Sequence, residues 1–148
     1  MVVPWTLVAN VGDAQRFAAA IARAPVYRDP RGTNITGALR FSHAALRRNQ
    51  FAGTRLVIDV SGDGENNIDP PPDGARDVIV QEGITINGLS LEILPDKKKD
   101  WRFGPTSSYY AAHVIGGPGA FVLSAHGSEA FEETLKRKLS REVVALAE

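Results

Sequence analysis

The chain contains no cysteine, one methionine and no excess charge of either sign, because 17 Lys and Arg balance 17 Asp and Glu among 148 residues. The absence of cysteine excludes thiol nucleophiles, Cys-ligated zinc, iron–sulfur clusters and disulfides. A net charge of zero gives no polyelectrolyte argument for binding nucleic acid or anionic lipid. These absences leave a folded domain that must be stabilised by its apolar core.

Long apolar runs are also missing, since no stretch approaches the roughly 18 apolar residues that cross a bilayer. Residues 1–10 lack the basic and then apolar segments of a signal peptide. As written, we expect a soluble, cytoplasmic chain with no membrane span and no export signal. We also expect a single domain over 1–148, because a chain of this length buries about 70% of its unfolded surface.

Strand-type and helix-type patterns alternate along the chain. The first predicted strand contains Pro4, which has no N–H to donate, and therefore belongs at a sheet edge. The second is almost entirely apolar apart from Asp59, which is typical of a strand covered on both faces. The predicted strands are 2–8, 56–60, 84–91 and 120–124.

Helical spacing predicts five helices, and each longer one has an apolar face. They begin at Asp13, at Thr33 or Asn34, at 70–72, at Tyr109 and at Ser128. In the first helix Phe17, Ala20, Ile21 and Ala24 recur at helical spacing, and in the last Phe131, Leu135, Leu139 and Val143 share one face. The second helix is expected to bury Ile35, Leu39, Ser42, Ala45 and Leu46, and the third to direct Ala75, Val78 and Ile79 inward. The alternation predicts an α/β fold, with a mostly parallel, Rossmann-like sheet and helices on both faces.

Two polar segments lie where such a sheet binds ligands, beyond the carboxyl ends of its strands. Residues 61–67 follow the second strand, and their D-x-S-x-D-G pattern, counted from Asp59, imitates half of an EF-hand loop. Pro70 stands where that loop needs a bidentate Glu, so a strand-to-helix turn is the simpler interpretation. The second segment, 32–34, opens a helix, and N-capping alone explains its Thr and Asn.

Short segments in a fixed order carry a family resemblance over nearly the whole chain. They are GTNI at 32–35 with Ala38 and Leu39, VIDVSGDG at 57–64 with Asn66 and Asn67, ARD at 75–77, GITINGL at 83–89, Tyr109 and Tyr110, VIGGPGAFV at 114–122, and RKL at 137–139. From Trp5 onward the sequence resembles von Willebrand factor A-type domains, in particular a bacterial family of unknown function with that fold.

The resemblance implies a metal ion-dependent adhesion site at the top of the sheet, with Thr33 and Asp63 as ligands. Magnesium, or calcium or manganese, would suit such hard oxygens. The D-x-S-x-S motif that supplies the other ligands is missing upstream of Thr33, and Asp59 and Ser61 already belong to the loop that ends in Asp63. We therefore expect a degenerate site that binds metal weakly, and no other cofactor.

The chain begins at what looks like the family's third strand, so the middle strand of the sheet is absent. This predicts an N-terminally incomplete domain with an unpaired edge on the 56–60 strand, and hence a homodimer or a partner that donates a strand. The 2–8 strand is an alternative occupant of that place. Members of the family often look exported, so an in-frame D-x-S-x-S upstream of Met1 would restore metal binding and change the expected compartment.

Catalytic motifs are poorly represented, and we expect a non-enzymatic interaction domain. His43, His113 and His126 are isolated and fit surface or helix-end positions, and no G-x-S-x-G, H-E-x-x-H or P-loop is present. The glycines at 117 and 119 precede a strand, unlike a dinucleotide fingerprint. The alternative function is a hydrolase or phosphatase-like enzyme that uses Asp59, Asp63 and a divalent metal.

One further loop combines charge with aromatic side chains and leaves the expected ligand face. Its residues Lys97, Lys98, Lys99, Trp101 and Arg102, with Phe103, are candidates for contacting an acidic protein partner. A solvated loop whose aromatic side chains fold onto the domain is the simpler interpretation. Nucleic acid is not expected to bind there, because aspartates flank the lysines.

Overall fold

A computed structural model describes residues 2–25, 32–68, 70–92, 105–127 and 129–144. Contacts divide the chain into two units, 1–31 and 32–148, and each is described by itself. The expectation of one domain over 1–148 stays a prediction. The first unit contains one helix, α1 (Val11–Arg23), in its described residues.

The start of α1 is set by a reciprocal cap at Asn10 rather than by Asp13. The Oδ1 atom of Asn10 accepts the N–H of Asp13 at 3.0 Å, and Asp13 Oδ2 accepts the N–H of Ala9 at 3.0 Å. The Asn10 side chain thus satisfies a donor that the first turn leaves open, and the Asp13 side chain binds the N–H of the residue before the cap. No residue of α1 is buried, and Ile21 is 52% exposed.

The predicted edge strand at 2–8 is also wrong, because none of the described residues 2–10 is in a strand. Pro4 removes one ladder donor, and its carbonyl accepts the hydroxyl of Thr6 at 3.0 Å, which is a local contact. High β-propensity becomes a strand only where a neighbouring strand pairs with it.

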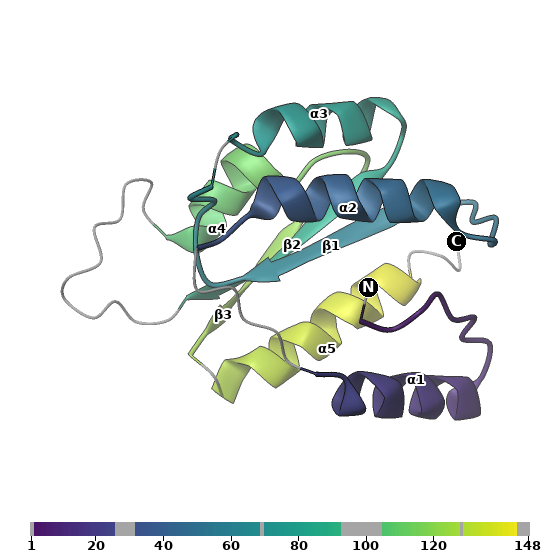
Figure 1. The fold of residues 1–148 in the computed structure, drawn as a ribbon. Helices are drawn as coiled ribbons and strands as arrows, with labels where there is room; N and C mark the ends of the chain where they lie inside the picture. The colour runs from purple at the N-terminus through teal and green to yellow at the C-terminus, as the bar shows by residue number, and fades with distance from the viewer. Residues whose placement is uncertain (1, 26–31, 69, 93–104, 128, 145–148) are drawn as a thin grey trace. The chain divides into compact units, whose positions relative to one another are not determined.

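The second unit is built on a parallel three-stranded sheet in the order β1-β2-β3, which confirms the predicted fold class. The strands are β1 (Val57–Gly62), β2 (Thr85–Glu92) and β3 (Val122–His126). Figure 1 shows α2 (Ile35–Arg48) and α3 (Asp73–Gln81) on one face of the sheet and α5 (Glu129–Val144) on the other. A short helix α4 (Thr106–Tyr109) continues into a π-helical turn, η1 (Tyr110–Val114).

The two faces of the sheet differ because alternate residues of a strand point to opposite sides. Ile58 of β1 pairs in register with Ile86 of β2, and both belong to the apolar core with α2, α3 and η1. The next pair along the strands, Asp59 and Asn87, carries polar side chains on the α5 side. The core members are Ile35, Leu39, Ile58, Ala75, Ile79, Ile84, Ile86, Tyr109, Tyr110 and Val114.

Several predicted burial patterns were wrong. Only Ile58 is buried in β1, so this strand is not covered on both faces; Asp59 and Ser61 are exposed by residue area. Val78 of α3 is 52% exposed, and Leu139 of α5 is 49% exposed. Within the described residues β1 pairs only with β2, which places it at the predicted open edge.

Alanine substitutions at two glycines test the packing of the sheet. A Cβ at Gly88 of β2 would stand 3.0 Å from Ile115 Cγ2 and Tyr110 Cδ1, so Gly88→Ala overpacks the core and lowers the free energy of unfolding by about 1–3 kcal/mol. Gly74→Ala, in α3 with nothing within 4 Å, is the matched control and stabilises by about 0.5–1 kcal/mol. Urea denaturation measures both, and equal effects would contradict this packing.

Candidate functional site

Asparagine side chains tie the loop after β1 to the start of α2. The Oδ1 atom of Asn67 accepts the N–H of Thr33 at 2.7 Å, and the N–H of Asn67 donates to the Thr33 carbonyl at 3.0 Å. Asn66 accepts the N–H of Ile35 at 2.7 Å and donates to the Ile68 carbonyl at 2.6 Å. The structure thus brings together the two polar segments that the sequence singles out.

Thr33 and Asp63, the two predicted metal ligands, lie in these adjoining segments. Thr33 is half-buried, and its Oγ1 would lie 4.0 Å from a Cβ atom added to Gly64, the residue after Asp63. Asp63 itself is exposed. Across the described ranges, no group of three or more His, Cys, Asp or Glu side chains could hold a metal ion. One hydroxyl and one carboxylate supply too few oxygens for the near-octahedral shell of magnesium. These residues do not fit a resident ion, and their assignment as a degenerate site stays a prediction.

Among the described residues of the second unit, the most buried charged side chain is that of Lys138 in α5, which is 1% exposed. Its Nζ donates to Oδ1 of Asp59 on β1, a residue far from it in sequence, and to Oε1 of Glu142 at 2.6 Å, one turn further along α5. The Asp59 side chain is therefore directed to α5, whereas Asp63 lies in the loop beyond the strand. This arrangement gives no support to an enzyme that uses the two aspartates together.

A buried asparagine extends this ion-pair network across the sheet. Asn87 of β2 is 0% exposed; its Nδ2 donates to Glu142 Oε1 at 2.8 Å, and its Oδ1 accepts the N–H of Phe121 at 3.2 Å. The guanidinium of Arg141 lies 4.0 Å from the centroid of the Phe121 ring. The network thus links β1, β2, the segment before β3 and α5 through groups that are all hydrogen-bonded, as buried polar groups must be.

The pKa values of the two carboxylates in this network shift in opposite directions. Partial burial of the Asp59 carboxylate raises its pKa to about 6, in spite of the hydrogen bond from Lys138, and the nearby Glu142 adds to the rise. Burial also acts on Glu142, but the hydrogen bonds with Lys138, Asp59 and Asn87 outweigh it and lower the pKa of Glu142. One lysine faces two carboxylates, so the second negative charge is only partly compensated.

Sequence reasoning missed Lys138, Glu142 and Asn87. The available signals were Asp59 as the one charge in an apolar run and the i, i+4 spacing of Lys138 and Glu142. The predicted apolar face of α5 concealed them, because Thr134 and Lys138 occupy its buried positions while Phe131 and Leu135 are half-buried.

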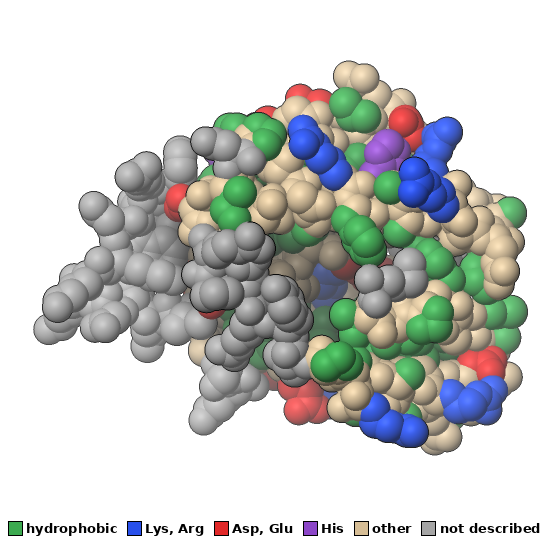
Figure 2. Space-filling model, viewed as in Figure 1, with side chains coloured by type: hydrophobic (Ala, Val, Ile, Leu, Met, Phe, Trp, Pro, Cys, Tyr) green, Lys and Arg blue, Asp and Glu red, His purple; other side chains and the backbone are tan. Residues whose placement is uncertain are grey.

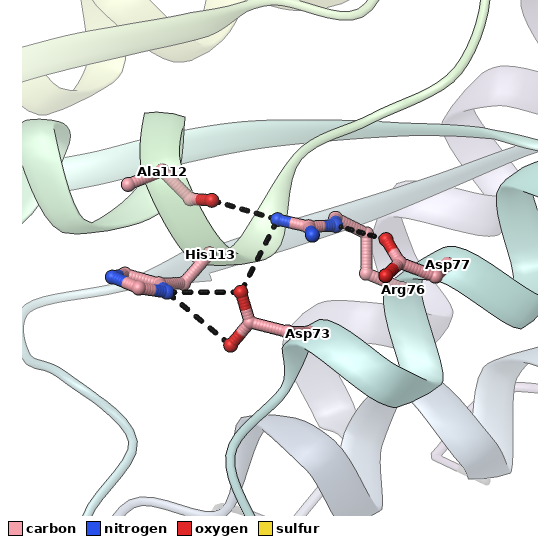
Figure 3. Close-up of polar contacts among 5 residues, drawn as sticks. All are labelled: Asp73, Arg76, Asp77, Ala112 and His113. Carbon is pink, nitrogen blue, oxygen red and sulfur yellow. Dashed lines mark hydrogen bonds and ion pairs between the residues drawn. The ribbon is translucent and has the colours of Figure 1, made fainter.

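A second polar cluster joins α3 to η1, as Figure 3 shows. Nδ1 of His113 lies 3.0 Å and 3.2 Å from the two carboxylate oxygens of Asp73. Arg76 lies 3.5 Å from Asp73 Oδ1, bonds to Asp77 Oδ1 at 2.9 Å through Nε, and donates to the Ala112 carbonyl at 2.7 Å. The cluster fixes η1 against the first turn of α3.

Aromatic side chains adjoin this cluster. The ring of Tyr109 lies 4.9 Å from that of His113 between centroids, and burial raises the pKa of Tyr109. Burial, with the charge of Asp63 adding to it, raises the pKa of Tyr110 to about 12. Both tyrosines therefore stay neutral at physiological pH, and both rings belong to the apolar core.

The remaining predicted residues are distributed over the surface or lie outside the described part. His43 bonds to Glu82 Oε2 at 2.9 Å, and His126 is exposed at the end of β3. The candidate partner loop, Lys97, Lys98, Lys99, Trp101 and Arg102, lies outside the described residues. On the face shown in Figure 2, basic side chains form small separate groups with acidic groups near them, and no broad patch of one sign is visible.

Together, a parallel sheet with helices on both faces and a polar carboxyl end define a protein of the open α/β class. The chain belongs to the family described as protein of unknown function DUF1194, whose model matches residues 1–147. Comparisons with curated proteins and with solved structures gave no match. None of the helices in the described ranges has the length and apolar character to cross a bilayer.

Replacing the buried lysine tests the ion-pair network. Lys138→Met leaves Asp59 and Glu142 without their cation, so the free energy of unfolding falls by about 3 kcal/mol at neutral pH. Lys136→Met is the matched control, because Lys136 is exposed and pairs with Glu132 at 2.6 Å, so its removal should leave stability nearly unchanged. Urea titrations measure both, and equal losses would show that the network adds nothing.

The Asp73 carboxylate should make stability depend on acid. Partial burial opposes the effect, but the hydrogen bond from His113, with backbone and Arg76 contributions, lowers the pKa of Asp73 below 3.8. The ionised Asp73 therefore stabilises the fold fully at a pH above the pKa that this residue has in the unfolded chain. This stabilisation is lost as the pH falls through the lower pKa of the folded state. The stability advantage of the wild type over Asp73→Asn therefore shrinks in urea titrations from about pH 7 to about pH 3, and a constant difference would refute the assignment.

Proposed function

We propose that this chain is a non-enzymatic protein-interaction domain of von Willebrand factor A type, which binds an extended segment of a partner protein at the open edge of β1. The sequence resemblance supports the type of domain. The edge position of β1 in the described sheet supports the place of binding, since an unpaired strand offers N–H and C=O groups to an incoming strand. This edge is the observation that carries the proposal.

Metal-assisted docking and catalysis are both less well supported than strand addition at the edge of β1. Thr33 and Asp63 alone supply too few ligands for an ion that a partner's carboxylate could complete. Asp59, the proposed partner of Asp63 in the alternative enzyme, is paired with Lys138. Backbone pairing at β1 needs neither group, so it is the mode of binding that the site supports best.

A proline in β1 tests this mode of binding. Alternate residues of a parallel strand direct their backbone groups to opposite sides, and those of Ser61 point away from β2. Ser61→Pro therefore removes an N–H donor that only an added strand would use. Random extended peptides displayed on phage are selected on the wild-type chain, and their affinities are measured by fluorescence anisotropy. We expect Ser61→Pro to weaken binding at least about tenfold.

Ser61→Ala is the matched control, because it removes the hydroxyl and keeps the N–H; it should bind as the wild type does. Circular dichroism establishes that both variants are folded. The proposal is contradicted if selection yields no peptide that binds the wild type, or if the selected peptides bind the folded proline variant equally well.

A further inference from the structure

The backbone groups at the free edge of β1 form a regular and symmetric set. The carbonyl of Leu56 accepts the N–H of Thr85 at 3.1 Å, which fixes the side of the strand that faces β2. Alternate residues of a parallel strand bond to opposite sides. Val57, Asp59 and Ser61 therefore direct their N–H and C=O groups away from β2, with Asp59 at the centre.

We propose that a second copy of this chain adds antiparallel to β1, with the two Asp59 residues opposite each other at the two-fold axis, and that protonation at this pair strengthens the dimer. The inference rests on the proposed function and names its partner. In this register Val57 pairs with Ser61 of the other copy, so all three outward residues exchange hydrogen bonds. A two-fold interface needs such a self-complementary surface.

Within the second unit, the described residues around β1 leave room for a symmetric partner on the α5 side. In the second unit, α5 packs mainly over β2 and β3 and reaches β1 through the side chain of Lys138. The Asp59 side chain is 36% exposed and Ser61 is exposed, so this side of the strand is incompletely covered. The net charge of zero imposes no overall repulsion between two copies.

The charges at the axis make the pairing depend on pH. Opposed residues of a hydrogen-bonded antiparallel pair have Cα atoms about 5.5 Å apart with side chains on the same face, so two ionised Asp59 carboxylates repel. In the described residues, the charged groups that contact Asp59 are Lys138 and Glu142 of α5, while β2 presents the neutral Asn87. Each copy thus has two carboxylates for one ammonium.

Adding a proton removes this repulsion and allows the two Asp59 carboxyl groups to share a hydrogen bond. Burial already raises the pKa of Asp59 to about 6 in one copy, and a second carboxylate raises it further in the dimer. The dimer then binds more protons than two separate copies do. By linkage, the dissociation constant falls as pH falls through this range.

Sedimentation equilibrium of the full chain at about pH 7.5 and about pH 5 tests the proposal, over about 1–100 μM protein. We expect a reversible dimer whose dissociation constant is at least about tenfold lower at the acidic pH. Circular dichroism first establishes that the Ser61→Pro variant is folded. This variant should then remain monomeric at both pH values.

Two aspartate variants locate the proton. Asp59→Asn removes the repulsion while Lys138 keeps Glu142 as its partner, so this variant should dimerise at about pH 7.5 as tightly as the wild type does at about pH 5, with little dependence on pH. Asp63→Asn is the matched control, because Asp63 is an exposed aspartate in the loop beyond the strand; it should keep the wild-type dependence.

A wild-type chain that stays monomeric at both values of pH overturns the inference. So does a dimer that is indifferent to pH, a dimer that persists in Ser61→Pro, or an unchanged pH dependence in Asp59→Asn. The peptide-binding experiment separates this failure from that of the proposed function. If peptides bind the edge of β1 while the chain remains monomeric, the interaction edge stands and only the second copy as its partner is rejected.

Discussion

The burial of Lys138 is the constraint on which the second unit depends. Its ammonium is 1% exposed and is paired with Asp59 on β1 and Glu142 on its own helix. An unpaired charge at that depth costs several kcal/mol, so α5 can pack only in the orientation that brings Lys138 to both carboxylates. This requirement turns Leu139, which is 49% exposed, away from the sheet.

The contact between Lys138 and Asp59 also determines which face of the sheet each residue of β1 points to. Because Asp59 must face α5, its neighbour Ile58 faces α2 and α3 and joins the apolar core. A slip of one residue between β1 and β2 would bury the carboxylate among apolar side chains and expose the isoleucine. Asn87, the register partner of Asp59, bonds to Glu142 and to the N–H of Phe121 and so joins β2 to α5 and to the segment before β3.

Local patterns predicted much of the fold, because alternation of strands and helices, a cap at Asn34 and the glycine that ends α3 depend on neighbours in sequence. The edge position of β1 was also predicted. The orientation of α5 was not, since periodicity assigns apolar residues to the buried face, whereas Lys138 is placed there by an aspartate 79 residues earlier. At the candidate site, the link between the segments 32–34 and 61–67 came from the family resemblance, and the asparagine bonds that join them were missed.

These asparagine bonds also bear on how the site can act. The Asn66 amide accepts the N–H groups of Ile35 and Thr36 and donates to the carbonyls of Ile68 and Pro70. Recruiting it as a metal ligand would release the first turn of α2. At the carboxyl end of the sheet these polar groups bind one another, so our proposal places partner binding at the backbone edge of β1 instead.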